Sequence, residues 1–199
     1  MTRRPLPLSI LVTVALSIGL VAPSIAHAEK GETYIGLSGH LLPWGKLETG
    51  DSQYGDHTIE VTYGFGIHGE HALLGFFALG ATVELLFPSW SGEVGRELVL
   101  DPHVRLFYPG ESWEPYVKGE IGGSFLWPPK EPYRSEFAAG WNWSAALGSV
   151  FRWTHVGIFA EAGYGQLHGE TRYETLSEKR KIRLDAHRVF LDLGVVVVF

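Results

Sequence analysis

The sequence predicts an all-β protein that closes into an antiparallel, eight-stranded, up-and-down barrel. From Thr33 onward, apolar residues alternate with small or polar residues in one segment after another, and no segment sustains an apolar repeat of 3.6 residues. Glycine is frequent, with 25 residues, and aromatic residues make up 13% of the chain, whereas charged residues make up only 19%. This composition excludes a disordered chain, which would lack the apolar and aromatic residues needed for a core.

The first 28 residues have the layout of a secretory signal peptide. Two arginines lie near the start, an apolar stretch follows from Leu8 to about Ala22, and small residues precede a predicted cleavage point before Glu29. The apolar stretch is shorter than the roughly 20 residues that a transmembrane helix needs. We therefore expect residues 1–28 to be cleaved and residues 29–199 to form the barrel domain.

The first four predicted strands follow one another from the N-terminal side. The first is predicted at 34–41. At 58–67 the odd-numbered residues are apolar and the even-numbered ones are Thr, Glu and Gly, and the same parity largely holds at 73–87. At 100–108 the parity is reversed, because the charged residues now occupy odd positions. Each segment therefore has one apolar and one mixed face, as expected of a strand.

The last four predicted strands show the same two-sided pattern. At 117–127 and 141–153 the large apolar residues occupy odd positions. At 157–165 the pattern is less clean, with apolar residues at even positions opposite Gly and Glu. At 188–199 every odd-numbered residue is apolar, ending at Phe199.

The apolar faces are predicted to contact lipid rather than a protein core. The opposite faces mix Gly and Ser with acids and bases, which is the polarity of a membrane barrel with a polar interior. Most segments have about ten residues or more, the length that a tilted strand needs to cross a bilayer. Aromatic residues gather at strand ends in two belts, as two membrane interfaces would favour. Tyr34 and Tyr116 are predicted to lie in one of these belts. The tryptophans of the two belts that are predicted to form an aromatic girdle are Trp44, Trp90, Trp127, Trp141 and Trp153.

The connections predict an orientation. Long polar connections are expected at about 43–57, 88–98, 128–138 and 168–185, and short ones at 68–71, 109–114 and 154–155. Long loops outside and short turns in the periplasm are typical of membrane barrels, so both termini are expected in the periplasm. An open sheet edge in lipid would leave backbone groups unpaired at several kcal/mol each, so the last strand is expected to pair with the first.

Two segments of the chain resemble segments of a known family, the small outer-membrane β-barrel proteins of Gram-negative bacteria. The OmpA-like membrane domain is the familiar member of that family. The stretch Glu114-Pro115-Tyr116-Val117-x-Gly119-x-Ile121-Gly122 is similar to a stretch common in these barrels. The C-terminal strand resembles the signal that the family's outer-membrane assembly machinery reads, which here comprises Leu193, Val195, Val197 and Phe199. The resemblance implies an integral protein of the outer membrane. The peptidoglycan-binding domain that follows the OmpA-like barrel is not found in this sequence.

The mixed faces predict a charged lumen. Eight strands enclose an interior just wide enough to be filled by side chains. Buried charges cost several kcal/mol each unless they are paired, so facing acids and bases predict an internal ion-pair network, for example between Glu120 and Arg152. The predicted network comprises Glu60, Glu84, Asp101, His103, Arg105, Lys118, Glu120, Arg152, Glu161, Arg188 and Asp192.

The sequence favours a non-enzymatic function, a structural barrel that displays loops on the cell surface. A narrow gated pore for ions or small solutes is the first alternative. A lipid A-modifying acyl hydrolase or acyltransferase is the second, with Asp51, Ser52, Asp56 and His57 as a cluster in the first outer loop. No His-x-Ser pair and no G-x-S-x-G motif occurs.

The expected partners are outer-membrane lipids and lipopolysaccharide. Because Arg pairs well with phosphate, a basic run before the last strand is predicted to contact lipopolysaccharide. That run comprises Lys179, Arg180, Lys181 and Arg183. The net charge of −6 does not indicate the basic surface that nucleic-acid binding requires. No cofactor and no metal site are expected, the absence of Cys excludes thiolate ligands, and the protein is expected to be a monomer.

Overall fold

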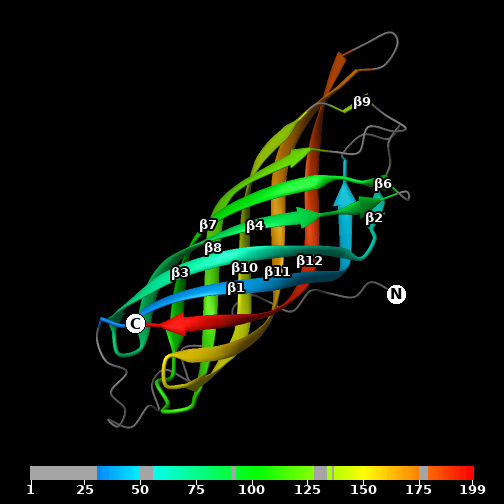
Figure 1. Ribbon diagram of the computed structural model, residues 1–199. Coiled ribbons are helices and arrows are strands. Elements are labelled where there is room, and N and C mark those ends of the chain that lie inside the picture. The colour runs from blue at the N-terminus through cyan, green and yellow to red at the C-terminus, as the bar shows by residue number, and fades with distance from the viewer. Residues whose placement is uncertain (1–30, 50–55, 91–92, 128–133, 136, 175–178) are drawn as a thin grey trace, which may run out of the picture.

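The computed structural model describes residues 31–49, 56–90, 93–127, 134–135, 137–174 and 179–199 (Figure 1). The predicted signal peptide, residues 1–28, lies outside these ranges. The eight long strands are β1 (Thr33–Glu48), β3 (Thr62–Leu74), β4 (Phe77–Phe87), β7 (Arg96–Phe107), β8 (Trp113–Trp127), β10 (Ala138–Trp153), β11 (Val156–Glu174) and β12 (Lys179–Val198). Four short strands accompany them: β2 (His57–Ile59), β5 (Ser89–Trp90), β6 (Glu93–Val94) and β9 (Arg134–Ser135). No helix in the described ranges has the length and apolar character to cross a bilayer.

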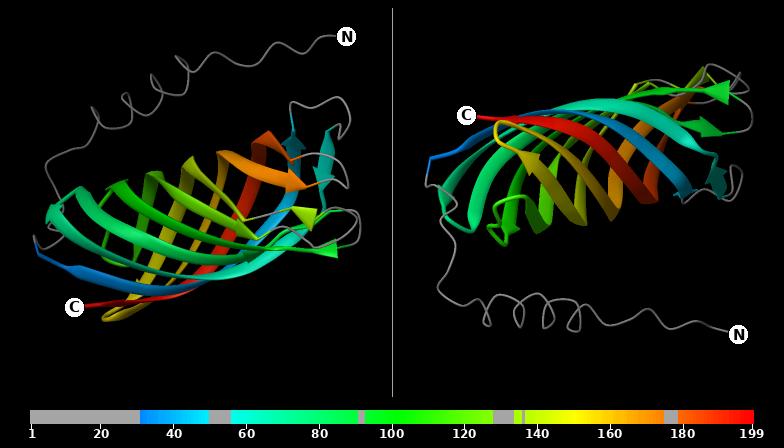
Figure 2. Two further views of the ribbon diagram at one scale, coloured as in Figure 1. Left: turned by 90° about the horizontal axis from the view of Figure 1, so that it is seen from above. Right: turned by 60° about the horizontal axis from the view of Figure 1, so that its bottom comes forward.

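The long strands form a closed antiparallel barrel, which confirms the predicted fold class. Each long strand pairs with the next in the chain, and β12 pairs with β1 to complete the ring. This closing pair runs from Tyr34 opposite Val198 to Glu48 opposite Asp185. Figure 2 shows the strands wrapping around one axis with a common tilt. Closure matters physically because it leaves no long strand with an unpaired edge in the bilayer.

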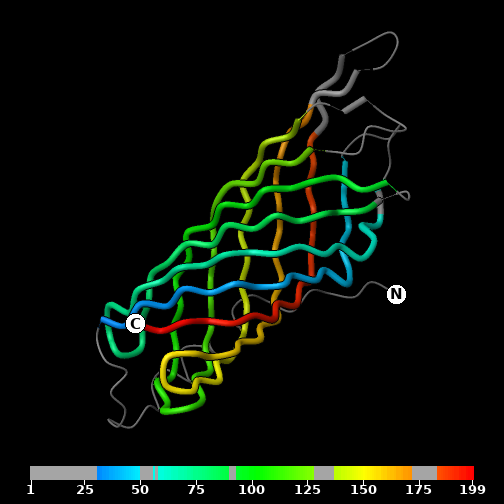
Figure 3. Tube along the Cα trace, viewed as in Figure 1, coloured from blue at the N-terminus to red at the C-terminus, as the bar shows by residue number. Residues whose placement is uncertain are grey.

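Both ends of the described chain lie at the same end of the barrel, together with the short turns (Figure 3). Thr33 and Phe199 exchange backbone hydrogen bonds of 3.0 and 2.9 Å there. The turns at this end consist of residues 75–76, 108–112 and 154–155. We call it the inner end, and the opposite one the outer end.

Two predicted connections are wrong because the strands are longer than the apolar alternation. Residues 68–71 were expected to form a turn, but β3 continues to Leu74. Residues 168–185 were expected to form a loop, but β11 continues to Glu174 and β12 begins at Lys179. Backbone pairing needs no apolar face, so a hairpin that leaves the lipid can extend with polar residues on both sides. In Figure 1 this hairpin rises beyond the rest of the barrel at the outer end.

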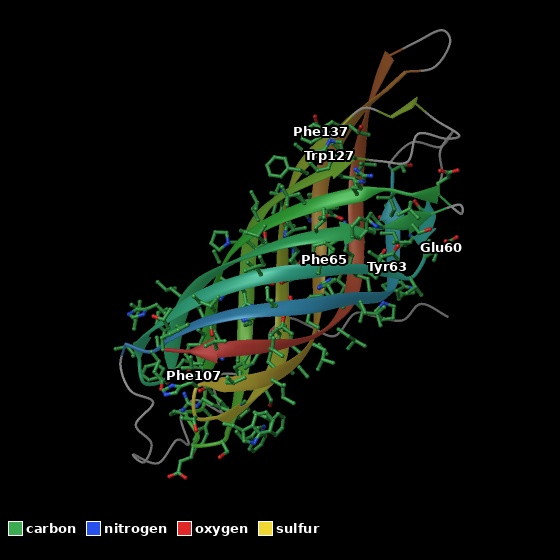
Figure 4. All side chains as sticks on the ribbon, in the orientation of Figure 1. Glu60, Tyr63, Phe65, Phe107, Trp127 and Phe137 are labelled. Atoms are coloured by element: carbon green, nitrogen blue, oxygen red, sulfur yellow. The ribbon has the colours of Figure 1, made fainter. Side chains whose placement is uncertain are left out.

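The outer surface of the barrel is apolar on every long strand. On β3, Tyr63 and Phe65 are 60% and 57% exposed, and Figure 4 labels both on the barrel wall. Large exposed residues of the same kind include Ile35, Leu37, Val83, Val104, Ile121, Leu147, Ile158, Leu193 and Val195. Soluble monomers rarely expose contiguous apolar patches larger than a few hundred Å², so a continuous belt of this kind is a lipid-facing surface.

Candidate functional site: the charged lumen

The lumen holds all but one of the charged residues predicted to face it. Its side chains are buried or nearly so and form ion pairs or hydrogen bonds. The predicted residues that face the interior are Glu84, Asp101, His103, Arg105, Lys118, Glu120, Arg152, Glu161, Arg188 and Asp192.

Glu60 is the exception, and its predicted place in the lumen is wrong. It lies between β2 and β3, is exposed at the outer end, and accepts a hydrogen bond of 2.8 Å from Ser89 Oγ (Figure 4). The interruption between the two strands shifts the alternation by one residue. As a result Ile59 points inward, at 4% exposure, whereas Val61 is 58% exposed.

Arg105 organises the inner half of the lumen. Its guanidinium lies 2.7 Å from a carboxylate oxygen of Glu70 and 2.9 Å from one of Glu114. Its Cζ also lies 4.6 Å from the ring centre of Tyr34 and 5.1 Å from that of Tyr116, within the range of cation–π attraction. The sequence predicts both tyrosines in an aromatic belt at the membrane interface, but they are buried inside the barrel. They thereby stabilise the most enclosed cation of the lumen.

Lys118 is the second centre of charge. Its Nζ lies 2.5 Å from Glu161 and 3.2 Å from Glu120. Glu120 also accepts a 2.7 Å hydrogen bond from Ser144. The predicted pair of Glu120 with Arg152 does not form, because Arg152 lies at the inner end and pairs with Glu32 at 2.8 Å.

Arg188 and Glu97 form the third centre, nearer the outer end. The two side chains make a bidentate pair at 2.8 and 2.7 Å, and Ser124 donates a 2.6 Å hydrogen bond to Glu97. Two parallel bonds of this kind are the strongest geometry for an Arg–carboxylate pair.

Sequence reasoning missed several lumen residues, among them His40, Glu70, Glu97 and Glu114. The three glutamates lie in segments predicted as connections. A signal was present, since Glu114, Tyr116, Lys118 and Glu120 share one parity, as Glu97 does with Asp101 and His103.

Buried apolar residues form three layers among these charged groups along the barrel axis. The innermost layer comprises Tyr34, Ala72, Ala78, Phe107, Tyr116, Val150, Phe159, Val196 and Val198. A middle layer comprises Leu42, Leu86, Val99, Ala146 and Phe190. The outermost layer comprises Leu47, Ile59, Leu126, Ala138, Leu167, Leu184 and Ala186. Two described cavities remain in the lumen, of about 20 and 40 Å³, enough for one to a few waters.

The tryptophans of the predicted girdle and the predicted assembly residues lie outside the lumen wherever their side chains are described. Trp44, Trp127 and Trp141 are 44–51% exposed toward the outer end, and Trp153 is 64% exposed at the inner end. The predicted assembly residues on β12 face outward, with exposures of 66% for Leu193, 48% for Val195, 38% for Val197 and 70% for Phe199. The side chain of Trp90 is outside the described part of the chain.

The basic run lies at the outer end, as does Asp56 of the loop cluster. Residues 179–183 belong to β12 rather than to a loop, and Arg183 is the one side chain of the run that is described. Of the cluster considered for lipid A chemistry, residues 51–55 are outside the described ranges. Asp56 is exposed and pairs with Lys46 at 2.8 Å.

No family model matches the chain, and no curated protein matches its sequence. Solved structures match its fold. The outer membrane protein OprG from Pseudomonas aeruginosa has a TM-score of 0.66 at 11% identity, covering 86% of this chain and 97% of that one. The outer membrane protein AlkL, in DMPC lipid bilayers, has a TM-score of 0.62 at 12% identity, covering 89% and 94%. The N-terminal β-barrel domain of Pseudomonas aeruginosa OprF has a TM-score of 0.52 at 15% identity, covering 85% and 98%.

The closed barrel and its apolar outer belt are those of a membrane-spanning β-barrel, and its fold is that of the small eight-stranded outer-membrane barrel proteins. At identities of 11–15% the likeness concerns the fold alone.

Replacing Arg105 tests the inner ion pairs. We expect Arg105→Met to lower the free energy of unfolding by about 3–5 kcal/mol, because Glu70 and Glu114 would remain buried without their cation. The triple variant Arg105→Met/Glu70→Gln/Glu114→Gln should recover most of that loss. Equilibrium urea unfolding in lipid vesicles, followed by tryptophan fluorescence, measures both. An Arg105→Met barrel as stable as the exposed control Lys46→Met would contradict this account.

Proposed function

We propose that the protein is a sealed, non-enzymatic barrel that anchors an outer hairpin at the cell surface. The observation that carries the proposal is the filling of the lumen. Three layers of buried apolar residues lie among the paired charges, and the described cavities hold no more than a few waters. An ion on this path would have to give up much of its hydration shell, because apolar side chains and charges that are already paired fill the interior.

The displayed element is the hairpin of β11 and β12. β10 pairs with β11 only as far as Glu170, whereas β11 and β12 remain paired from Val156 to Glu174. The end of the hairpin therefore extends beyond its neighbours, with the short strand β9 against Tyr173 and Glu174. A rigid barrel supports such a projection because its own strands cannot shift independently.

Conductance in planar bilayers tests the seal. We expect no current steps across the range of voltages that the bilayer tolerates, because the apolar layers interrupt any aqueous path. Stable openings would contradict the proposal. Openings whose size changes in Arg188→Met, which removes the pair with Glu97, would instead identify the gated pore considered above.

A lipopolysaccharide contact is proposed at the outer end of the same hairpin. The outward face of β12 changes from Val189 to His187, Asp185 and Arg183, which indicates where the lipid-facing surface ends. His168 Nδ1 lies 2.6 Å from Asp185, and Arg183 donates to Asp185 at 2.9 Å. Burial alone would raise the pKa of the Asp185 carboxyl. The hydrogen bonds with His168 and Arg183 outweigh that effect and lower the pKa. The Arg183 side chain is 71% exposed at this boundary, at the height expected for phosphate groups.

Neutralising the basic run tests this contact. Lys181→Gln/Arg183→Gln should lower the lipopolysaccharide that co-purifies with the barrel by about two- to fivefold, the effect of losing one or two exposed ion pairs. Arg96→Gln, a change of an exposed arginine elsewhere at the outer end, is the matched control. Equal amounts of lipopolysaccharide on both variants would refute the contact.

A further inference from the structure

Three strands bring one imidazole and two carboxylates together in the middle of the lumen. His40 on β1 lies opposite Asp192 on β12, at the pair of strands that closes the barrel. Glu84 approaches from β4, on the far side of β3. The space for this approach comes from Gly66 on β3, where a Cβ atom would lie 2.9 Å from Ser38 Oγ and 3.1 Å from Glu84 Cγ.

The ligand atoms of the three residues converge, and His40 Nδ1 is in close contact with Asp192 Oδ1. Glu84 Oε1 lies 3.6 Å from the same nitrogen, and the donor atoms of all three residues lie within 4.8 Å of one another. The Phe190 ring stacks on the His40 imidazole, with the two ring centres 5.4 Å apart, and thereby restrains the plane of the imidazole. The three side chains therefore place their ligand atoms within reach of one small cation.

The charge balance identifies the partner as a cation. The described lumen contains three fixed cations above the inner end, and each has its own carboxylates: Arg105 has Glu70 and Glu114, Lys118 has Glu120 and Glu161, and Arg188 has Glu97. In the described ranges, no lysine or arginine forms an ion pair with Glu84 or Asp192, which face His40 instead. Two buried carboxylates in one place are costly unless a positive charge joins them.

A cavity adjoins two of the three residues, His40 and Glu84. Its volume is about 40 Å³, and its lining includes His40, Glu84, Asp101 and Asn142. Asp101 Oδ1 and Asn142 Oδ1 are also buried without a hydrogen-bond partner. The cavity therefore has room for one or two waters and has acceptors that would hold them.

We propose that the lumen binds one divalent transition-metal ion of the zinc class through His40 Nδ1, Glu84 and Asp192, with water completing the shell. Zinc bonds to imidazole nitrogen and carboxylate oxygen at about 2.0–2.2 Å, so its ligand atoms lie roughly 3–4 Å apart. Glu84 already has this spacing from His40, and Asp192 would move outward slightly to reach it. Imidazole combined with carboxylates selects such metals over calcium or magnesium, which prefer oxygen ligands alone. The ion would neutralise the unpaired carboxylates and link β1, β4 and β12 across the closing strands, whether or not the barrel conducts.

Metal binding to the folded protein tests the site. Protein purified from outer membranes is unfolded in urea with a chelator and refolded into detergent with graded amounts of Zn²⁺, because a sealed lumen would not exchange metal with the solution. The bound metal per chain is then measured after dialysis. We expect one tightly held Zn²⁺ per chain, and Ca²⁺ should not compete. His40→Gln and Asp192→Asn should each weaken binding at least tenfold, since losing even an outer-shell partner of a metal typically costs roughly 10–100-fold. Heat-modifiable mobility on unboiled gels verifies that each variant is folded.

A matched control separates the lumen from the surface. His168→Gln/His187→Gln removes two imidazoles from the outward face of β11 and β12, and it should leave the tight site intact. Zinc lost in this control but retained in His40→Gln would overturn the proposal, as would the absence of saturable binding.

X-ray absorption of the wild-type protein with zinc needs no variant. One imidazole and carboxylate oxygens at about 2.0–2.2 Å support the site, and a shell of several imidazoles or of water alone contradicts it. If a proton shared by the three groups is the true occupant, no zinc will be retained.

Discussion

The pairing of β12 with β1 is the constraint on which the rest of the structure depends. A backbone N–H or C=O group in lipid has no water to bond, so a sheet in the bilayer is stable only when its edges meet. Here they meet along a register from Tyr34 opposite Val198 to Glu48 opposite Asp185. Closing the ring with eight strands also determines its width, and an interior of that width is largely filled by side chains.

A lumen of this width turns the inward side chains into a packed polar core. Each charged group must find its partner on another strand, which explains why Arg105 reaches Glu70 and Glu114, and why Arg188 meets Glu97 from across the barrel. The apolar side chains packed around these centres leave little room for water, and the low local dielectric strengthens the pairs. The same enclosure makes the group of His40, Glu84 and Asp192 unusual, because its two carboxylates face no lysine or arginine among the described residues.

The membrane made much of this fold predictable from the sequence. Lipid requires an apolar residue at every second position, so the strands and the inward parity of residues such as Lys118, Glu161 and Asp192 follow from the alternation. The prediction failed where strands leave the lipid, because a polar hairpin such as 168–185 shows no contrast between its faces. It failed again at Glu60, where the interruption between β2 and β3 reverses the parity. The meeting of His40 with Glu84 depends on strand order and on a glycine in the intervening strand, neither of which a single-strand pattern contains.

Accessibility along β12 tests the central claim, that alternate residues of a closed barrel face lipid and a sealed lumen. The chain has no Cys, so a single cysteine at each position from 191 to 197 can carry a nitroxide label without interference. In lipid vesicles, collisions with oxygen dissolved in the bilayer should be frequent at Leu191, Leu193, Val195 and Val197 and rare at the residues between them. Collisions with a water-soluble nickel complex should be rare at all seven positions. Oxygen access without a period of two, or nickel access at the inward positions, would contradict a sealed transmembrane barrel.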